Sequence, residues 1–449
     1  MQIMLDVNAA RVLMGDSLGF HIIFALLGVG LPLVIILLEQ LGLRRKDAMI
    51  LEHTKRLSYA TVVLVVAGVA SGTIISIQMS LMWGGLIKFG GPIMGLAFGW
   101  EGYAFMIEAV FLAFYVATWG KVKGWKHWLL GLPIAIGSFG SALAITLGNA
   151  WMQNPGKLNI VNGVVQTDNP LSALISKTAF YMITHSITGY YLATMLCVLG
   201  IYAFYTLRFK PKGIDLRAVK QIMYRLAASA VFFIFLTALI GHFQTQYLAQ
   251  SQPRKFAVIE LNETTRTHAP YIIAGHWTKD GKVEGGIRIP NMLSILTGDH
   301  PATEVKGLQD FPKDTWPMLI LNILFETKLL LVALISCVTI LFVLLHSKRL
   351  KEKIRDLRFK KPMLIALLPL GPLSVIVVEL SWMVAEFGRQ PYAVNGYLRT
   401  HEAFSASGQI GAWGYIFPVL FLVLFIVTIA ALWLLFKSEG KIRPAKGLL

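Results

Sequence analysis

The sequence predicts an all-α integral membrane protein with about nine transmembrane helices. Of its 449 residues, 55% are hydrophobic and only 14% are charged, and the mean hydropathy is +0.63. Soluble chains carry about 25% charged residues, so this composition excludes an ordinary soluble multidomain protein. Nine apolar segments are long enough to cross a bilayer, and they lie at about 18–40, 56–79, 95–119, 128–151, 179–206, 222–247, 316–346, 362–387 and 411–436.

The net charge of +17 is concentrated in alternate connections between these segments. Basic residues cluster at 44–56, 121–126, 208–225, 348–361 and 437–446. The positive-inside rule then predicts an N-terminus outside and a C-terminus in the cytoplasm. The basic excess is thus explained by membrane topology, and a nucleic-acid partner is not expected.

The first apolar segment lacks a positive n-region and a small-residue cleavage site, so we interpret it as a retained helix and not a signal peptide. Cys197 and Cys337 stand singly in apolar runs, which argues against a disulfide framework or a thiolate metal site. One connection, residues 248–315, is long and polar and falls on the outer side between the sixth and seventh helices. We therefore divide the chain into 1–247, the outer loop 248–315, and 316–449.

Two carboxylates lie within the third apolar segment. Glu101 and Glu108 are seven residues apart, which places them on one helix face about 10 Å from each other. A carboxylate at membrane depth costs several kcal/mol and needs a metal, a cation, water or transferable protons as a partner. The alternative is that one glutamate reaches the interface and the other is hydrogen-bonded to a neighbouring helix.

Other ionisable residues gather in the same outer half of the membrane. His21 begins the first segment, His185 lies one to two turns into the fifth, and Glu101 two turns into the third. The eighth segment ends outside with Glu379 and Glu386, and Arg389 follows one turn later.

This set of side chains suits a metal or a haem, although a lone helical histidine is more often structural. A Cys-x-x-Cys-His motif is absent, so any haem is noncovalent. Arg389 is placed to neutralise propionates.

The outer loop begins with an acid and a base in a short helix opened by Pro253. Lys255 and Glu260 are five residues apart. At the membrane surface such a pair can bind and deprotonate a quinol headgroup; a solvated ion pair is the alternative.

These residues resemble a known family, subunit I of the cytochrome bd quinol oxidases. The resemblance covers nearly the whole chain, and the motifs occur in the order of the family. The motifs are Phe20-His21, Trp100-Glu101-Gly102 with Glu108, Trp151-Met-Gln-Asn-Pro155, Gln252-Pro-Arg-Lys-Phe-Ala with Glu260, and Ala385-Glu-Phe-Gly-Arg-Gln-Pro391.

The resemblance implies three noncovalent haems near the outer face: two haems b, and a haem d or third haem b. His21 and Glu386 would be the axial iron ligands of the two high-spin haems, and His185 would ligate the low-spin haem. Glu101 would lie beside the oxygen-binding haem.

The other matched residues imply proton and quinol roles. Glu108 would carry protons to the oxygen-binding haem. Lys255 and Glu260 would belong to the quinol-oxidising loop.

The chain departs from the family at the low-spin haem. The stretch Phe325-Glu-Thr-Lys-Leu-Leu-Leu331 has Lys328 in place of the family's arginine and leucine in place of its ligand methionine. In addition, Gly241-His242 replaces a Gly-Asp pair. Met318, Lys328 and His242 are the candidate second ligands, and we favour His242.

The resemblance implies the haem-containing subunit of a terminal oxidase in the bacterial cytoplasmic membrane. It would oxidise quinol and reduce O2 to water with protons taken electrogenically from the cytoplasm. Its expected partners are oxidase subunit II, a small single-helix subunit and the bilayer. Two other functions stay open: a haem electron conduit without quinol oxidation, and a proton-coupled transporter without haem.

Overall fold

Nine long apolar helices form the molecule over the residues that the computed structural model describes, 2–345, 359–405 and 410–437. The prediction of nine transmembrane helices is therefore confirmed by the length and composition of the helices. They are α1 (Gln2–Arg45), α2 (Ala48–Met82), α3 (Gly84–Ala117), α4 (Trp125–Gln153), α6 (Lys177–Phe209), α7 (Gly213–Ser251), α10 (Leu321–Leu344), the pair α12 (Lys361–Leu367) and α13 (Leu370–Phe387), and α15 (Ile410–Lys437).

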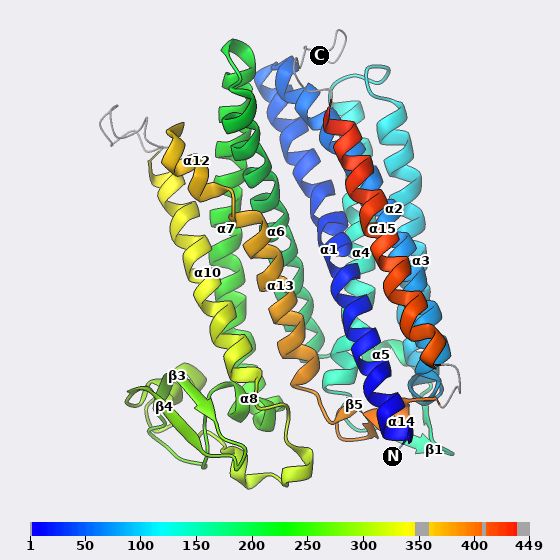
Figure 1. Ribbon diagram of the computed structural model, residues 1–449, viewed down its shortest axis with the longest axis vertical. Coiled ribbons are helices and arrows are strands. Elements are labelled where there is room, and N and C mark those ends of the chain that lie inside the picture. Colours follow the sequence, from blue (N-terminus) through cyan, green and yellow to red (C-terminus); the bar gives the residue numbers. More distant parts are fainter. Residues whose placement is uncertain (1, 346–358, 406–409, 438–449) are drawn as a thin grey trace.

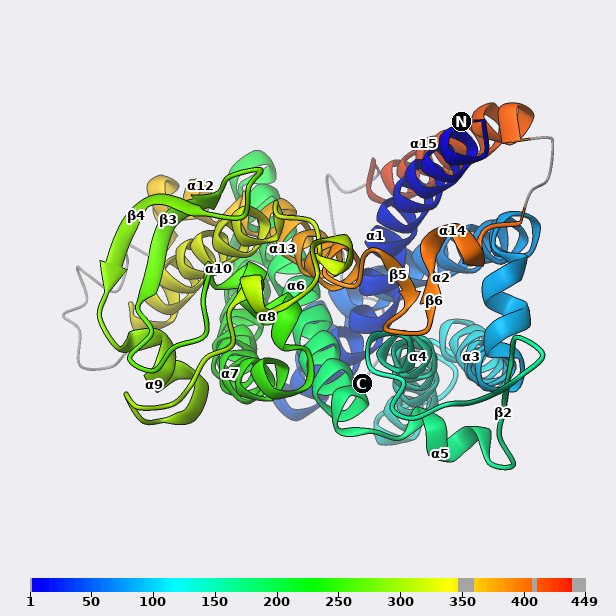
Figure 2. The ribbon, with the colours of Figure 1, turned by 90° about the horizontal axis from the view of Figure 1, so that it is seen from below.

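The helices run side by side and pack mainly in sequence pairs. α1 packs on α2, α3 on α4, and α6 on α7, while α10 packs on α13 (Figure 1). Seen from below, α6, α7, α10 and α13 form one group, α2, α3 and α4 form the other, and α1 lies between them (Figure 2).

The two ends of the bundle differ. The N-terminus and residues 252–320 lie at one end, here called the loop end, and α15 ends at the opposite end (Figure 1). That opposite end, here called the basic end, carries the connections around Lys46, 118–124 and Lys210. The basic stretch 348–361 lies mostly, and the tail 438–449 wholly, outside the described residues.

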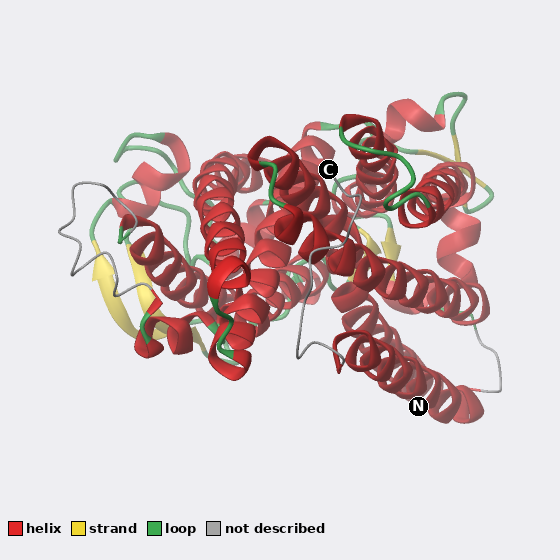
Figure 3. Cartoon of the chain, turned by 90° about the horizontal axis from the view of Figure 1, so that it is seen from above, coloured by secondary structure: helices red, strands yellow, loops and turns green. Residues whose placement is uncertain are grey.

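The description all-α holds for the bundle but misses three small hairpins, which lie at the far end when the molecule is seen from above (Figure 3). Each is an antiparallel pair of short strands joined by a short connection. The strands are too short for their hydrophobic pattern to predict them from the sequence. They are β1 (Asn159–Val161) with β2 (Val164–Gln166), β3 (Tyr271–Trp277) with β4 (Val283–Ile289), and β5 (Tyr392–Val394) with β6 (Leu398–Arg399).

The outer loop has an ordered structure of its own. α7 continues to Ser251 and α10 begins only at Leu321, so both predicted limits of the loop, 248 and 315, shift. Val258, Leu261, Ile272 and Leu308 form a small apolar core inside it. The other short elements of the loop are α8 (Pro253–Ile259), α9 (Met292–Gly298), η1 (Leu308–Asp310) and η2 (Lys313–Thr315). Two further short helices lie outside the loop, α5 (Pro170–Leu174) and α14 (Thr400–Ala403).

The third helix begins earlier than the sequence suggested. α3 starts at Gly84 and bends at Gly91, whose backbone is not helical (φ 16°, ψ −97°) and which precedes Pro92. A proline removes a helical hydrogen bond and clashes with the preceding turn, which explains the bend. Glu101 therefore lies more than about four turns beyond the start of α3, and the predicted depth of two turns was wrong.

Candidate functional site

The end of α13 is tied to α4 by a buried polar cluster. Glu386 accepts a hydrogen bond from the Asn149 side chain at 2.6 Å through one carboxylate oxygen and pairs with Arg389 through the other. Arg389 also donates to the carbonyl oxygen of Ala393 at 2.7 Å and is 8% exposed. The predicted Glu386 and Arg389 thus lie together, and each satisfies part of the other's charge.

The loop lysine reaches the same cluster. Lys255 of α8 is 7% exposed, and its Nζ donates to Gln153 Oε1 at 3.2 Å and to the carbonyl oxygen of Ala385 at 3.1 Å. Gln153 itself donates to that carbonyl at 3.0 Å. Because Ala385 immediately precedes Glu386, one hydrogen-bond network joins the loop to the end of α13.

The predicted acid–base pair of the loop is not a bonded pair. Glu260 is 6% exposed and directly follows α8. The positive charge that lowers its pKa is that of Lys328 in α10, not that of Lys255. Among the described residues, no ion pair joins Lys255 to Glu260. The interpretation as a solvated ion pair was therefore wrong, because both side chains are buried and turn to different partners.

Burial moves both loop groups toward their neutral forms. Loss of solvation lowers the pKa of Lys255 to about 7, partly offset by the charge of Glu386. Loss of solvation also raises the pKa of Glu260 to about 8, with Lys328 opposing the shift. Near neutral pH, both groups can exchange a proton at little cost, as acid–base work on a bound molecule requires.

His185 lies at the interface of α6 and α7. A Cβ added at Gly241 of α7 would come within 3.1 Å of His185 Cε1, so the glycine gives the imidazole room. His185 Nδ1 is buried and has no hydrogen-bond partner among the described residues.

The three candidate partners of His185 lie in different surroundings. His242 follows Gly241 on the next face of α7 and is exposed. Met318 is 39% exposed, just before α10. Lys328 is half-buried and packs over the Phe325 ring. Of the three, Lys328 is the one that is not exposed.

Glu379 of α13 lies close to α1 near His21, in the half of the bundle at the loop end. His21 Nδ1 lies 2.8 Å from Ser71 Oγ of α2. A Glu379 carboxylate oxygen lies 3.8 Å from the position that a Cβ would occupy at Gly19, two residues before His21. The other Glu379 oxygen is buried without a partner among the described residues.

Glu101 and Glu108 share one face of α3, as predicted. Glu108 is 2% exposed and Glu101 is half-buried. At Gly137, α4 packs directly on the α3 backbone, because an added Cβ would come within 2.8 Å of the Glu108 nitrogen. Glu108 Oε1 finds no partner in the described part of the chain, so a buried acid faces the bundle interior unsatisfied.

Sequence reasoning missed Asn149 and Gln153. Both project from one face of α4, one turn apart, and both serve the end of α13. Gln153 belongs to the motif Trp151-Met-Gln-Asn-Pro155 already singled out and Asn149 lies two residues before it, which was the available signal. A neutral amide carries no charge cost in an apolar run, and so it stood out less than the carboxylates.

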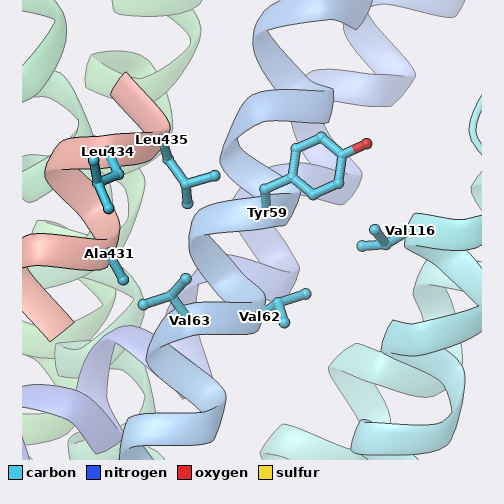
Figure 4. Close-up of a pocket in the computed structure, with 7 residues that line it drawn as sticks. All are labelled: Tyr59, Val62, Val63, Val116, Ala431, Leu434 and Leu435. Atoms are coloured by element: carbon cyan, nitrogen blue, oxygen red, sulfur yellow. The ribbon is translucent and has the colours of Figure 1, made fainter. Parts of the chain in front are cut away.

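The described surface also carries an apolar groove of about 530 Å³ between α2, α3 and α15. In Figure 4, Val62 and Tyr59 point toward Val116 of α3, while Val63 points toward Ala431 of α15. Leu434 and Leu435 complete the lining. None of the charged site residues lies in this groove, so it is not the candidate site.

Comparison with known proteins gives consistent matches over the whole chain. The family model of cytochrome bd terminal oxidase subunit I matches residues 9–440. A Bacillus subtilis protein named "Putative cytochrome bd menaquinol oxidase subunit I" is 32% identical over 435 residues, covering 97% of each chain. The same organism's cytochrome bd ubiquinol oxidase subunit 1 is 25% identical, over 98% of this chain and 94% of that one.

A solved structure agrees with the fold. A chain of the bd oxidase from Geobacillus thermodenitrificans superposes with a TM-score of 0.90 at 31% identity, over 97% of this chain and 99% of that one. The chain therefore belongs to the cytochrome bd terminal oxidase subunit I family.

Proposed function

We propose that this chain, as a member of that family, is the haem-containing subunit of a membrane-bound terminal oxidase that oxidises quinol and reduces O2 to water. The names of the relatives, a menaquinol oxidase subunit and a ubiquinol oxidase subunit, support an oxidoreductase of this kind. The observation that carries the proposal is the network that joins Lys255 through Gln153 and Ala385 to Glu386.

The donor set at the loop end fits noncovalent haem. Imidazoles of His21 and His185 and the carboxylate of Glu386 are oxygen and nitrogen donors of the kind that haem iron accepts. Three buried polar atoms have no partner among the described residues and fit a bound polar group: His185 Nδ1, Glu379 Oε1 and Arg389 Nε. Bound haems would supply one-electron transfer and oxygen chemistry. We propose two haems b, and a haem d or third haem b.

The protein supplies the proton chemistry around those groups. Glu260 is the candidate base for the quinol hydroxyl, and Lys255 holds the headgroup near Ala385, next to Glu386. Electrons from the quinol would then enter at the end of α13, beside Glu386, one of the proposed iron ligands. On the other side, Glu101 and Glu108 deliver protons for water formation along one face of α3.

Menaquinol is the substrate that the features of the chain favour. The most similar of the two relatives named above carries menaquinol in its name. A low-spin haem without a methionine ligand has a lower reduction potential, which suits a low-potential quinol. The second ligand of that haem would be His242, as the sequence favoured, or Lys328, which is half-buried.

The missing methionine also supports a second candidate, a haem electron conduit without quinol oxidation. Leucine at the methionine position would leave His185 alone on a five-coordinate iron if no other side chain replaces it. A proton-coupled transporter without haem is the remaining alternative, since buried carboxylates also relay protons in carriers.

Orientation and partners follow from the family. We propose the loop end outside and the basic end in the cytoplasm of a bacterial plasma membrane, as the positive-inside rule indicates. The proposed partners are oxidase subunit II and a small single-helix subunit. Protons taken from the cytoplasm then cross half of the membrane past Glu108, which makes the reaction electrogenic without a pump.

Oxygen uptake by the purified complex tests the proposal. With a reduced menaquinol analogue, the complex should consume O2 and lose this activity in the Lys255→Met variant, with its haem content unchanged. Haem-containing protein that consumes O2 with an artificial electron donor but not with quinol would favour the conduit. Protein without haem would favour the transporter.

A further inference from the structure

A second buried polar cluster lies at the basic end, far along α3 from the loop. Glu39 of α1, Tyr115 of α3 and His127 of α4 are at most 2% exposed. Tyr115 donates its hydroxyl to Glu39 Oε2 at 2.7 Å, and His127 Nδ1 lies 2.7 Å from Glu39 Oε1. His127 Nε2 lies 2.9 Å from the carbonyl oxygen of Tyr115.

These contacts fix the number of protons in the cluster. A carbonyl oxygen can only accept, so His127 Nε2 carries a hydrogen. One further proton must then lie between His127 Nδ1 and Glu39 Oε1, because without it two lone pairs would face each other at 2.7 Å. The pair is either imidazolium with carboxylate or neutral imidazole with carboxylic acid, and one transferable proton is shared in both.

The cluster continues the face of α3 that carries the two site glutamates. Glu101, Glu108 and Tyr115 follow one another at intervals of seven residues. Tyr115 lies about 10 Å beyond Glu108 along the helix, near the end of α3 at the basic end. Between the two levels lies an apolar layer that includes Leu112 of α3 and Ile134 of α4, 3% and 0% exposed.

We propose that the Glu39–His127 pair is the proton-loading site of this chain, through which protons from the basic end reach Glu108. The proposal rests on the proposed function, since oxygen reduction is what consumes the protons. Glu108 Oε1, which lacks a partner among the described residues, is the nearest acid toward the site on the same face.

The transfer is a simple proton relay. The shared N–H or O–H bond of the pair breaks, water that enters between Leu112 and Ile134 carries the proton, and an O–H bond forms on the Glu108 carboxylate. The pair is left with facing lone pairs and takes a new proton from water at the basic end. Tyr115 is a positioning residue, because its hydroxyl holds the Glu39 carboxylate toward His127.

A purely structural role is the competing explanation, and the molecule holds a matched control. His53 Nε2 of α2 lies 3.0 Å from Asp215 Oδ1 of α7, and Tyr205 donates to the same carboxylate at 2.7 Å. This second histidine–acid–tyrosine cluster also lies toward the basic end, but it is not on the face of α3. Both clusters brace helices, whereas the proposal gives only one of them a proton path.

The test compares Glu39→Gln and His127→Gln with Asp215→Asn and His53→Gln in the purified oxidase complex. Glutamine at either position keeps hydrogen bonding but cannot share the proton. We expect oxygen uptake per haem to fall about 10-fold or more in the first two variants, with a larger solvent deuterium effect, and to stay near wild type in the controls. Glu39→Asp should restore much of the rate, because it keeps a carboxyl group.

Two further readings separate the explanations. Anaerobic reduction of the haems by quinol, which needs no proton from the basic end, should keep its wild-type rate in all variants. Infrared difference spectra between low and high pH should show a carboxyl or carboxylate band of the pair that Glu39→Gln removes, a readout independent of turnover.

Each outcome decides between the proposals. Unchanged oxygen uptake in Glu39→Gln, or an equal loss in Asp215→Asn, would overturn the inference while leaving the proposed function intact. If Glu39→Gln loses haem and His127→Gln keeps it, unchanged oxygen uptake in His127→Gln would overturn the inference and a loss of about 10-fold would support it. A wild-type complex that does not consume O2 would overturn the proposed function itself.

Discussion

The acidic and basic side chains at the two ends of the bundle are built in opposite ways. At the basic end, Glu39 and His127 bond directly to each other and every polar atom of the pair is engaged. At the loop end, Lys255 and Glu260 are about as well buried, yet they turn to different neighbours. A pair whose polar atoms are all hydrogen-bonded within the protein can hold and release a shared proton without a ligand. Separated groups with unsatisfied neighbours, such as Arg389 Nε and His185 Nδ1, suit the binding of something else.

The largest effects are expected at the loop end, from the proposed iron ligands. His21→Ala or Glu386→Ala should each remove one high-spin haem and abolish oxygen uptake, because no other side chain can replace an axial ligand at that depth. Haem extraction and the oxygen electrode measure both. Glu304→Gln, at an exposed loop carboxylate, is the control and should change neither. Full haem content in either alanine variant would end the assignment.

The next effect concerns the link between the two ends, Glu108. Glu108→Gln keeps shape and hydrogen bonding but cannot release a proton, so turnover should fall about 100-fold with all haems retained. Steady-state oxygen uptake together with the absorption spectrum checks this. Unimpaired turnover would mean that protons reach the site by another route and that Glu108 does not link the Glu39–His127 pair to the loop end.

A smaller effect is expected in the pH profile of quinol oxidation. Burial raises the pKa of Glu260 to about 8, so the carboxylate that accepts the quinol proton forms only as the pH rises through about 8. kcat/KM for quinol should therefore increase with pH over that range. In Glu260→Gln it should be about 10-fold lower and nearly flat. Glu284→Gln, at an exposed strand position, should keep the wild-type profile; a rising profile in Glu260→Gln would remove Glu260 as the base.

The smallest expected effect is a change in the spin state of the proposed low-spin haem. Electron paramagnetic resonance of the oxidised protein should show a low-spin haem signal. One of the two variants, His242→Ala or Lys328→Met, should lose this signal, and that variant identifies the second ligand. Met318→Leu should leave the signal in place, because Met318 precedes the start of α10 at Leu321 and lies ten residues, about three turns, before Lys328. Loss of the signal only in Met318→Leu would show that the ligand has remained a methionine.

Much of the bundle could be predicted because hydropathy is a local property of the chain. The positions of the helix ends could not, since polar residues such as Asp6 and Arg11 continue α1 well beyond the apolar run. The kink at Gly91 was also missed. Its Gly-Pro sequence is a clear break signal, but the apolar residues after it led us to place the start of the helix too late.

The charged residues of the site were readable for a physical reason: a charge inside an apolar run is costly and therefore rare. Their partners were not readable, because the bonds from Lys255 to Gln153 and from Glu386 to Asn149 join segments far apart in sequence. Glu39 and His127 escaped notice because each lies near a helix end, where a charged side chain is ordinary.

The most direct test of the account is the reduced-minus-oxidised spectrum of the purified complex, followed by haem extraction. The account predicts noncovalent haem that acid acetone removes, with b-type bands from at least two haems and a third band from haem d or a further haem b. A complex that is folded but shows no haem absorbance would contradict it, since the unsatisfied polar atoms at the loop end would then need another explanation.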